Sequence, residues 1–347
     1  MSEPVQGLCT LQRRRFLSTD PAMIDRFGDP FRPLEPECKV VQFDQPLTPA
    51  QLQQAGNLIA KRPDVQPYVY GRASRDLSFL RYFPALRRLD ITLHELGDIG
   101  GFAYVARSLE ELTFGRTKQT FSLRFLATMP QLRRLFLVRH KKDLPVIGGL
   151  SNLTGLGLSG ITLADLSVLL PLTALRDLSI FLASTTNLAL LPKLLALEDL
   201  FLMRITKLSD LSVLGDLVGL KTLRLDWMRN VTSLPNLAGL ARLEDVTLDT
   251  MKGLTDLSPV GSGTGSPPAF HCGHAAAYRR KFSLLPGPSQ SERTVGLHRK
   301  EPCERRRETC FPGYRTVKAD SGVRGQESGI RRQESGRKGA DDDHNGC

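Results

Sequence analysis

The segment Ile147–Leu158, IGGLSNLTGLGL, decides the fold because its apolar residues follow a fixed rhythm. Isoleucine or leucine stands at positions 147, 150, 153, 156 and 158, in steps of three, three, three and two residues. The alternation at the end of the segment suits a short strand whose leucines point inward. The three-residue steps before it suit a tight helical return on the outer side. One such unit cannot bury its own leucines, so the pattern predicts a stack of similar units.

The same rhythm recurs along the chain. The position equivalent to Leu153 falls at residues 86, 109, 132, 153, 175, 197, 220 and 243, in steps of 21 to 23 residues. An amphipathic helical bundle would require a 3.6-residue period, which this rhythm does not give. The repeat therefore predicts an α/β solenoid, a curved right-handed superhelix with a parallel concave sheet. The expected strands are 88–92, 111–115, 134–138, 155–159, 177–181, 199–203, 222–226 and 245–249.

A short motif, Asp-Leu-Ser, stands between successive units in four places. Its copies are Asp76–Ser78, Asp165–Ser167, Asp210–Ser212 and Asp256–Ser258. An aspartate at that point can cap the short turn that follows it. With this motif and its leucine register, the chain resembles the leucine-rich-repeat family in its 22-residue, internalin-like bacterial form. The resemblance covers about residues 65–260; it implies a leucine-rich-repeat solenoid and implies little about function.

The chain departs from that family at one position in every repeat. The family usually has asparagine three residues after the last strand leucine. Here the position holds His94, Thr117, His140, Ile161, Ala183, Ile205, Met228 and Met251. The turn after each strand must therefore satisfy its backbone groups in another way.

The sequence before the repeats predicts an N-terminal cap over residues 38–72, which shields the first unit. Val40–Phe43 has the composition of a strand, and Thr48 followed by Pro49 is a helix start. Val65, Tyr68 and Tyr70 then form a degenerate first repeat, so the cap is expected to be β-α-β. Residues 1–37 are rich in proline and arginine and are interpreted as an irregular arm, and residues 73–260 as the repeats.

Residues 261–347 break the pattern, because the register stops in the middle of a unit after Val260. This segment holds 16 Lys or Arg and 10 Asp or Glu, so +6 of the formal net charge of +11 lies in it. Two interpretations stay open. One is a low-order basic tail. The other is a frameshifted reading of further repeats, because a shift of one nucleotide permits leucine codons at 266 and 269, where the next strand is due.

No catalytic motif is found: the chain has no phosphate-binding loop, no G-x-S-x-G and no H-E-x-x-H. His94 and His140 are isolated and are interpreted as turn residues. His271–His274 with Cys303 and Cys310 matches no zinc spacing. The sequence thus predicts no enzyme, no metal and no cofactor.

A binding surface is predicted on the concave side, where the non-leucine residues of each strand point. Large apolar side chains among charged ones there resemble the hot spots of protein interfaces. The candidate residues are Arg88, Arg134, Phe136, Val138, Asp177, Phe181, Asp199, Phe201, Met203, Arg224, Asp226 and Asp245.

The expected function is therefore a protein-interaction module that holds another protein on its concave face. The alternative is a repeat-bearing bacterial effector or enzyme subunit, ligase-like, with its chemistry in the tail. Nucleic-acid binding is disfavoured because the repeats carry no basic stripe with stacking aromatics. Residues 1–260 have only two cysteines, Cys9 and Cys38, and the N-terminus has no apolar run after Arg13–Arg15. We therefore expect a cytoplasmic protein without membrane insertion.

Overall fold

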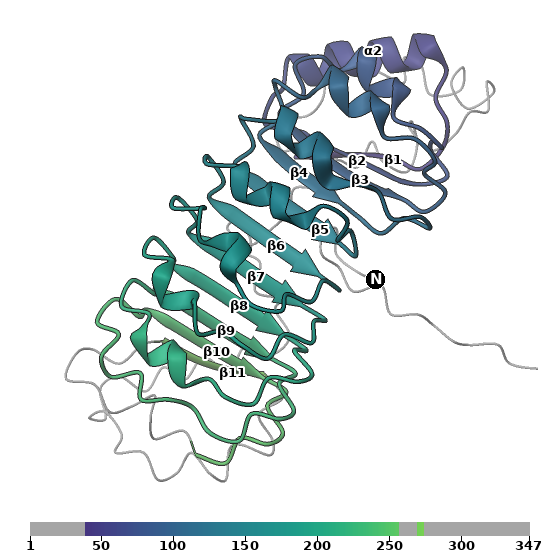
Figure 1. Ribbon diagram of the computed structural model, residues 1–347. Helices are drawn as coiled ribbons and strands as arrows, with labels where there is room; N and C mark the ends of the chain where they lie inside the picture. The colour runs from purple at the N-terminus through teal and green to yellow at the C-terminus, as the bar shows by residue number, and fades with distance from the viewer. Residues whose placement is uncertain (1–38, 257–268, 274–347) are drawn as a thin grey trace, which may run out of the picture. The chain divides into compact units, whose positions relative to one another are not determined.

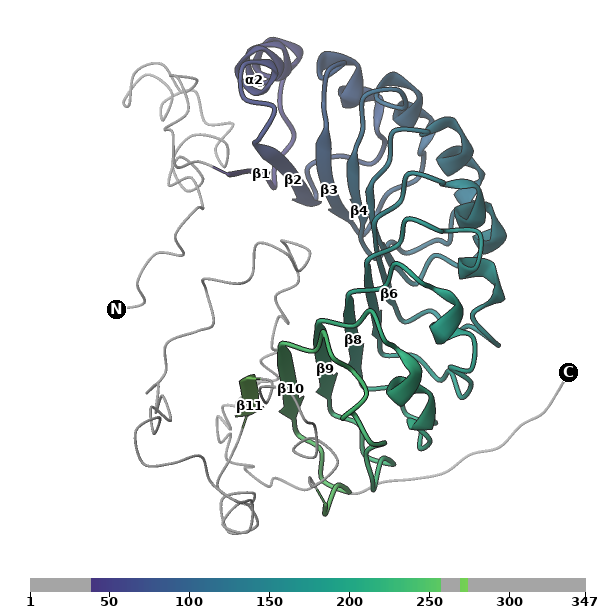
Figure 2. The same ribbon diagram turned by 90° about the vertical axis from the view of Figure 1, so that its left-hand side faces the viewer.

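The computed structural model describes residues 39–256 and the backbone of residues 269–273. The chain divides into two compact units, residues 1–311 and 312–347, and the described residues belong to the first. Eleven strands of this unit pair in parallel and in sequence order, from β1 to β11. Figures 1 and 2 show that the strands form a curved sheet and that the short helices lie along its outer, convex side. The predicted leucine-rich-repeat solenoid is confirmed.

The repeat strands lie where the leucine register places them, within one residue at their ends. They are β3 (Arg88–Leu93), β4 (Glu111–Phe114), β5 (Arg134–Val138), β6 (Gly155–Ser159), β7 (Asp177–Phe181), β8 (Asp199–Met203), β9 (Thr222–Asp226) and β10 (Asp245–Asp249). Leucines meet their counterparts across the ladder, as in Leu156↔Leu178 and Leu178↔Leu200. These side chains are buried and form one continuous core along the stack.

The outer returns are short 3₁₀ helices, as the three-residue apolar steps predicted. They are η2 (Ser78–Tyr82), η3 (Gly100–Tyr104), η4 (Leu123–Thr128), η5 (Leu144–Gly149), η6 (Ser167–Leu169), η7 (Leu191–Lys193) and η8 (Ser212–Asp216). In the Asp-Leu-Ser copies the aspartate Oδ1 accepts a hydrogen bond from the serine N–H, at 2.8 Å for Asp76, Asp165 and Asp210. The fourth copy extends beyond the described residues.

The N-terminal cap has the expected β-α-β order: β1 (Val40–Phe43), α2 (Pro49–Ala60) and β2 (Gln66–Gly71). Thr48 caps the helix, and the Gln51 side chain returns to the Thr48 backbone N–H, which completes a capping box. Helix α2 lies close to the first repeat because Gly56 has no side chain: a Cβ there would stand 2.0 Å from the carbonyl oxygen of Tyr82.

The turn after each strand satisfies its backbone groups by hydrogen bonds of the backbone itself, in place of an asparagine side chain. The first residue after β5 to β10 has a positive φ, and these residues are Arg139, Gly160, Leu182, Arg204, Trp227 and Thr250. The backbone N–H of each of the first five donates to the last carbonyl of the next strand, as Leu182 does to Met203 at 2.9 Å. A left-handed backbone turn therefore continues the ladder without asparagine. From Ile161 to Met251, the residues at the positions where the family usually has asparagine are apolar and buried.

The ladder continues past the end of the leucine register. Strand β11 (Ala269–Gly273) pairs with β10, and the pairs run from Asp245↔Ala269 to Asp249↔Gly273. The leucines stop before this strand, although the spacing of the register placed the next strand near residue 266. The arm at 1–37, the rest of the tail with its frameshift hypothesis, and the side chains of the His271–His274 group lie outside the described residues.

Candidate functional site

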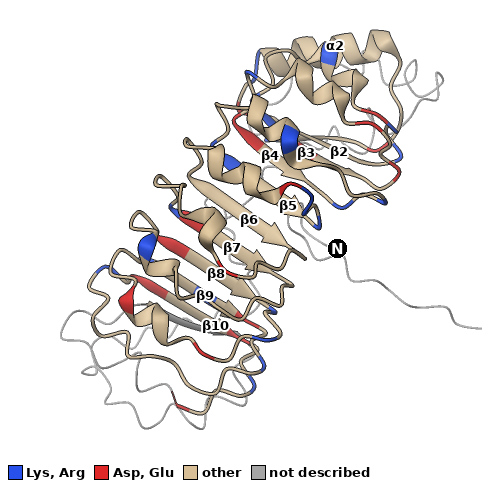
Figure 3. Ribbon diagram, viewed as in Figure 1, with Lys and Arg blue, Asp and Glu red and all other residues tan. Residues whose placement is uncertain are grey.

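The concave face of β3–β10 consists of the strand positions that alternate with the buried leucines. They form three columns, each running from strand to strand in register: a first column from Arg88 to Asp245, a second from Asp90 to Thr247 and a third from Thr92 to Asp249. Figure 3 shows acidic positions on the strands toward the C-terminal end of this ladder. The core residues are nearly the same in every repeat, whereas the residues of these columns differ from repeat to repeat. The concave face is therefore the part of the repeats whose sequence is specific to this chain.

Two of the predicted interface aromatics are buried, which corrects the expectation that they face water. Phe136 is 2% exposed and Phe181 is 5% exposed. Their ring centroids lie 5.9 Å apart, and Phe181 makes an edge contact of 4.8 Å with Phe201. They form an aromatic row that is separate from the leucine core. The sequence placed the residues on the correct side of the sheet but could not show how tightly they pack on one another.

The glycines of β6 explain how residues of β5 reach β7. Gly155 separates Arg134 from Asp177 in the first column, and Gly157 follows Phe136 in the second. Because Gly155 has no side chain, the Arg134 guanidinium approaches the Asp177 carboxylate to 3.4 Å. Over Gly157 the Phe136 ring reaches the Phe181 ring. The glycines of β6 thus leave room for side chains of β5 to reach β7.

Both arginines of the first column form ion pairs with carboxylates. The Arg88 guanidinium lies 3.4 Å from the Glu111 carboxylate, and Arg134 forms an ion pair with Asp177. Asp199 lies beside Asp177 on the next strand, as its partner across the ladder. Burial raises the pKa of the Asp177 carboxyl, and the Asp199 carboxyl beside it raises it further, whereas Arg134 lowers it. Within the described part of the chain, Arg134 is thus the one cation within ion-pair distance of this carboxyl pair, through its contact with Asp177.

A buried carboxyl lies at the other end of the concave face. Asp90 is 4% exposed, and its Oδ1 has no hydrogen-bond partner among the described residues. Thr92 hydrogen-bonds to its carboxyl group, and burial raises the pKa of Asp90 to about 8. Tyr68 pairs with Asp90 across the ladder, and its ring stacks on Tyr70 with centroids 4.7 Å apart. Asp90 is thus largely protonated at neutral pH.

The edge of the sheet after β7–β9 carries exposed side chains that the sequence analysis did not single out. Leu182 and Trp227 are each 40% exposed and occupy the left-handed turns. The Arg204 guanidinium lies 5.1 Å from the centroid of the Trp227 ring, in a cation–π contact. A lone tryptophan directly after a repeat strand was the available signal, since tryptophan is favoured at binding surfaces.

The predicted site residues fall into two groups by exposure. Phe136, Phe181 and Asp245 are buried. The others are half-buried and lie on the concave strands: Arg88, Arg134, Val138, Asp177, Asp199, Phe201, Met203, Arg224 and Asp226. The structure brings together Asp177, Asp199 and Phe201 on β7 and β8, whereas Arg88 lies four strands from Asp177.

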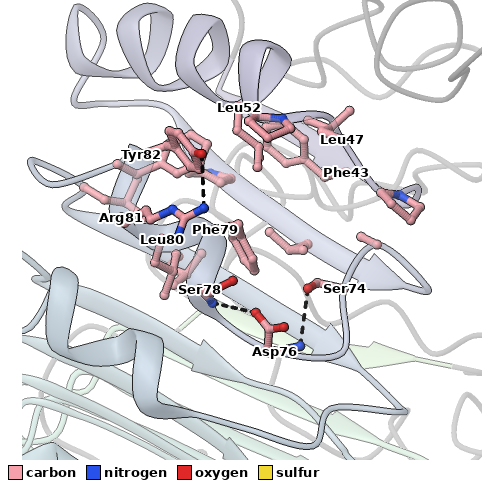
Figure 4. A pocket seen from close by; sticks show the side chains of 18 of the residues that line it. Phe43, Leu47, Leu52, Ser74, Asp76, Ser78, Phe79, Leu80, Arg81 and Tyr82 are labelled. Atoms are coloured by element: carbon pink, nitrogen blue, oxygen red, sulfur yellow. Dashed lines mark hydrogen bonds between the residues drawn. The ribbon is translucent and has the colours of Figure 1, made fainter.

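A cavity of about 200 Å³ lies between the N-terminal cap and the first repeat (Figure 4). Phe43, Leu47, Leu52 and Phe79 contribute apolar walls. Its polar groups are engaged locally: Asp76 accepts from the Ser78 N–H, and Arg81 donates to the Tyr82 hydroxyl at 3.2 Å. The cavity is therefore a feature of cap packing, and no paired acid and base line it among the described side chains.

The described residues offer little reactive chemistry. They contain no group of three or more histidine, cysteine, aspartate or glutamate side chains that could hold a metal ion. His140 is buried: its Nε2 donates to the Gly115 carbonyl oxygen at 3.0 Å and its ring stacks on Phe114. Burial lowers the pKa of His140, which suits a neutral structural histidine. Within the same residues no helix has the length and apolar character needed to cross a membrane.

No protein-family model and no curated protein matches the chain. Among solved structures, it is similar to an internalin C2 of Listeria monocytogenes, with a TM-score of 0.42 and 23% identity over 57% of this chain and 84% of that one. An internalin (inlF) of the same organism gives a TM-score of 0.41 and 18% identity over 72% and 79% of the two chains. A leucine-rich-repeat protein of Leptospira interrogans gives 0.39 and 15% over 70% and 72%. These likenesses concern the fold alone. Its leucine register and its parallel ladder of one strand per repeat give the chain the leucine-rich-repeat fold.

Proposed function

We propose that this chain is a protein-interaction module that holds its partner on the concave face. The observation that carries the proposal is the half-buried apolar pair Phe201 and Met203 on β8. Phe201 follows Asp199 by two residues, and Met203 pairs with Asp226 of β9. Apolar side chains that remain partly exposed within a charged surround are typical of interface anchors. The buried aromatic row beside them holds this part of the face in one conformation, which lowers the entropic cost of binding.

We further propose that the protein acts in the cytoplasm and performs no catalysis itself. The low cysteine content of the repeat region supports the first point, because chains of oxidising compartments more often use disulfides. The second is supported by the described concave side chains, which bring no nucleophile and base together. The alternative, with chemistry in residues 261–347, concerns side chains outside the described residues.

The test compares two double variants of the full chain in a capture experiment with crosslinking. Phe201→Ser with Met203→Ser should abolish capture of the partner, because hot-spot side chains typically contribute about 2 kcal/mol or more each. The matched control is Leu195→Ser with Val218→Ser, which removes two exposed apolar side chains that follow the outer helices η7 and η8. The control should leave capture intact. Equal loss in both variants, or loss in neither, would contradict the proposal.

A further inference from the structure

The concave surface of β7–β10 is acidic, although the chain as a whole has a formal net charge of +11. Its four strands present five aspartates and one arginine, Arg224, at concave positions. The aspartates stand at the two margins of the strands: Asp177, Asp199 and Asp245 in the first column, and Asp226 and Asp249 in the third. A surface of one sign attracts a partner of the opposite sign and repels others.

Within this surface the first-column pair lacks its own complement of positive charge. Asp199 is the partner of Asp177 across the ladder, and Arg134 is the one described cation within ion-pair distance of either carboxylate, at 3.4 Å from Asp177. Like charges in direct contact destabilise the free protein unless a proton or a second cation joins them. A basic side chain from outside would supply that cation.

Phe201 of β8 lies between the two acidic margins, and Met203 of the same strand lies on the third-column margin. Phe201 stands two residues after Asp199, and Met203 pairs with Asp226. A strand rises about 3.3 Å per residue, so the two margins are roughly 13 Å apart, which is the distance between residues i and i+4 of an extended chain. Trp227 is exposed at the turn beyond the third column.

Building on the proposed function, we propose that β7–β10 receive an extended segment of the partner protein that carries two arginine or lysine side chains four residues apart, with an apolar side chain midway between them. One basic side chain pairs with Asp177 and Asp199, and the other lies at the third-column margin. The apolar side chain packs on Phe201 and Met203. Nucleic acid does not suit this face, because its phosphates would meet the aspartates.

The single tryptophan of the chain, Trp227, gives a direct readout at the edge of this surface. We would titrate the full chain at low ionic strength with a capped peptide of sequence Ser-Arg-Ser-Leu-Ser-Arg-Ser and follow tryptophan fluorescence. A matched peptide with glutamate in place of arginine tests charge. The basic peptide should give a saturable change that weakens with added salt, and the acidic peptide should give none.

The double variant Asp177→Asn with Asp199→Asn should lower the affinity for the basic peptide at least about tenfold, since charged pairs contribute strongly to such contacts. The control Asp98→Asn with Asp216→Asn makes the same change of net charge at exposed positions of the outer surface and should change affinity little. Circular dichroism of each variant verifies the fold.

Three results would overturn the inference: no saturable response of the unmodified chain, an equal response to the acidic peptide, or equal weakening by both double variants. The first also covers occupancy of the face by the basic residues of the chain's own 274–347 segment. If the peptide fails while Phe201→Ser with Met203→Ser still abolishes partner capture, the concave-face function stands and only the partner's chemistry is wrong.

Discussion

The ring of Phe136 lies over the backbone of Gly157, so close that a Cβ on Gly157 would stand 2.1 Å from Cδ2 of the phenylalanine. Real Cβ atoms do not approach that closely, so this glycine is required by the ring beside it. The ring in turn is buried and contacts Phe181. The concave face is therefore partly a packed layer of its own, supported by a glycine on the neighbouring strand.

Gly157→Ala should destabilise the protein by about 1–3 kcal/mol, because the added methyl group forces the Phe136 ring out of its site. Chemical denaturation of the full chain measures the change. Gly149→Ala is the matched control, since a Cβ there meets nothing within 4 Å. In a Phe136→Ala background the Gly157→Ala penalty should nearly vanish, as expected for coupled neighbours. A penalty that stays the same in that background would disprove the contact as its cause.

Thr250→Gly should stabilise the chain by roughly 0.5–1 kcal/mol, because a β-branched residue at a φ of 50° is strained whereas glycine is not. The equivalent turn after β6 already uses glycine, at Gly160 with a φ of 65°. Thr247→Gly, three residues earlier in β10, is the comparison. It should cost about 1 kcal/mol, because glycine weakens a strand interior. Thermal melts that rank the two variants in the opposite order would contradict the assignment of strain.

The strands and the outer returns were predictable from the sequence because leucine spacing alone determines them. Each leucine of the register needs an identical neighbour, so spacing, pairing and direction follow together. The concave columns were predictable as positions, since alternation in a strand fixes the side on which a residue lies. Their exposure was not predictable. Whether Phe136 faces water depends on Gly157 and Phe181, which lie on other strands, and no local pattern reports contacts across strands.

The turn ladder was not predicted, and strand β11 was expected only from the spacing of the register. The missing asparagines indicated that the turns differ, but nothing in Leu182 or Trp227 as residue types indicates a left-handed backbone. At β11 the pairing Leu248↔Cys272 continues the ladder without a leucine in the new strand. Backbone hydrogen bonds maintain both features, and these depend little on the side chain.

Asp90→Asn should raise the stability of the protein at alkaline pH and change it little in acid. Burial raises the pKa of the Asp90 carboxyl from 3.8 to about 8, so the folded state holds this proton more tightly than the unfolded state does. The resulting stabilisation is complete below pH 4 and is lost as the pH rises through about 8. Above that pH, folding must bury a charged carboxylate beside Tyr68 and Thr92, whereas asparagine stays neutral. Since each pKa unit corresponds to about 1.4 kcal/mol, the gain at pH 9 should be roughly 2 kcal/mol or more.

Asp165→Asn should change the stability of the protein with the opposite dependence on pH, and it serves as the control for that prediction. The Ser167 side chain and N–H hold the pKa of Asp165 below its usual range, so the stabilisation from its charge is present at neutral pH and is lost as the pH falls through that lowered pKa. Asparagine still accepts the Ser167 bond but lacks the charge, so any cost of Asp165→Asn should appear at neutral pH and fade in acid. Urea denaturation of both variants at pH 4, 7 and 9 measures the two profiles. If Asp90→Asn were equally destabilising at all three pH values, the assignment of Asp90 as a buried, protonated carboxyl at neutral pH would be wrong.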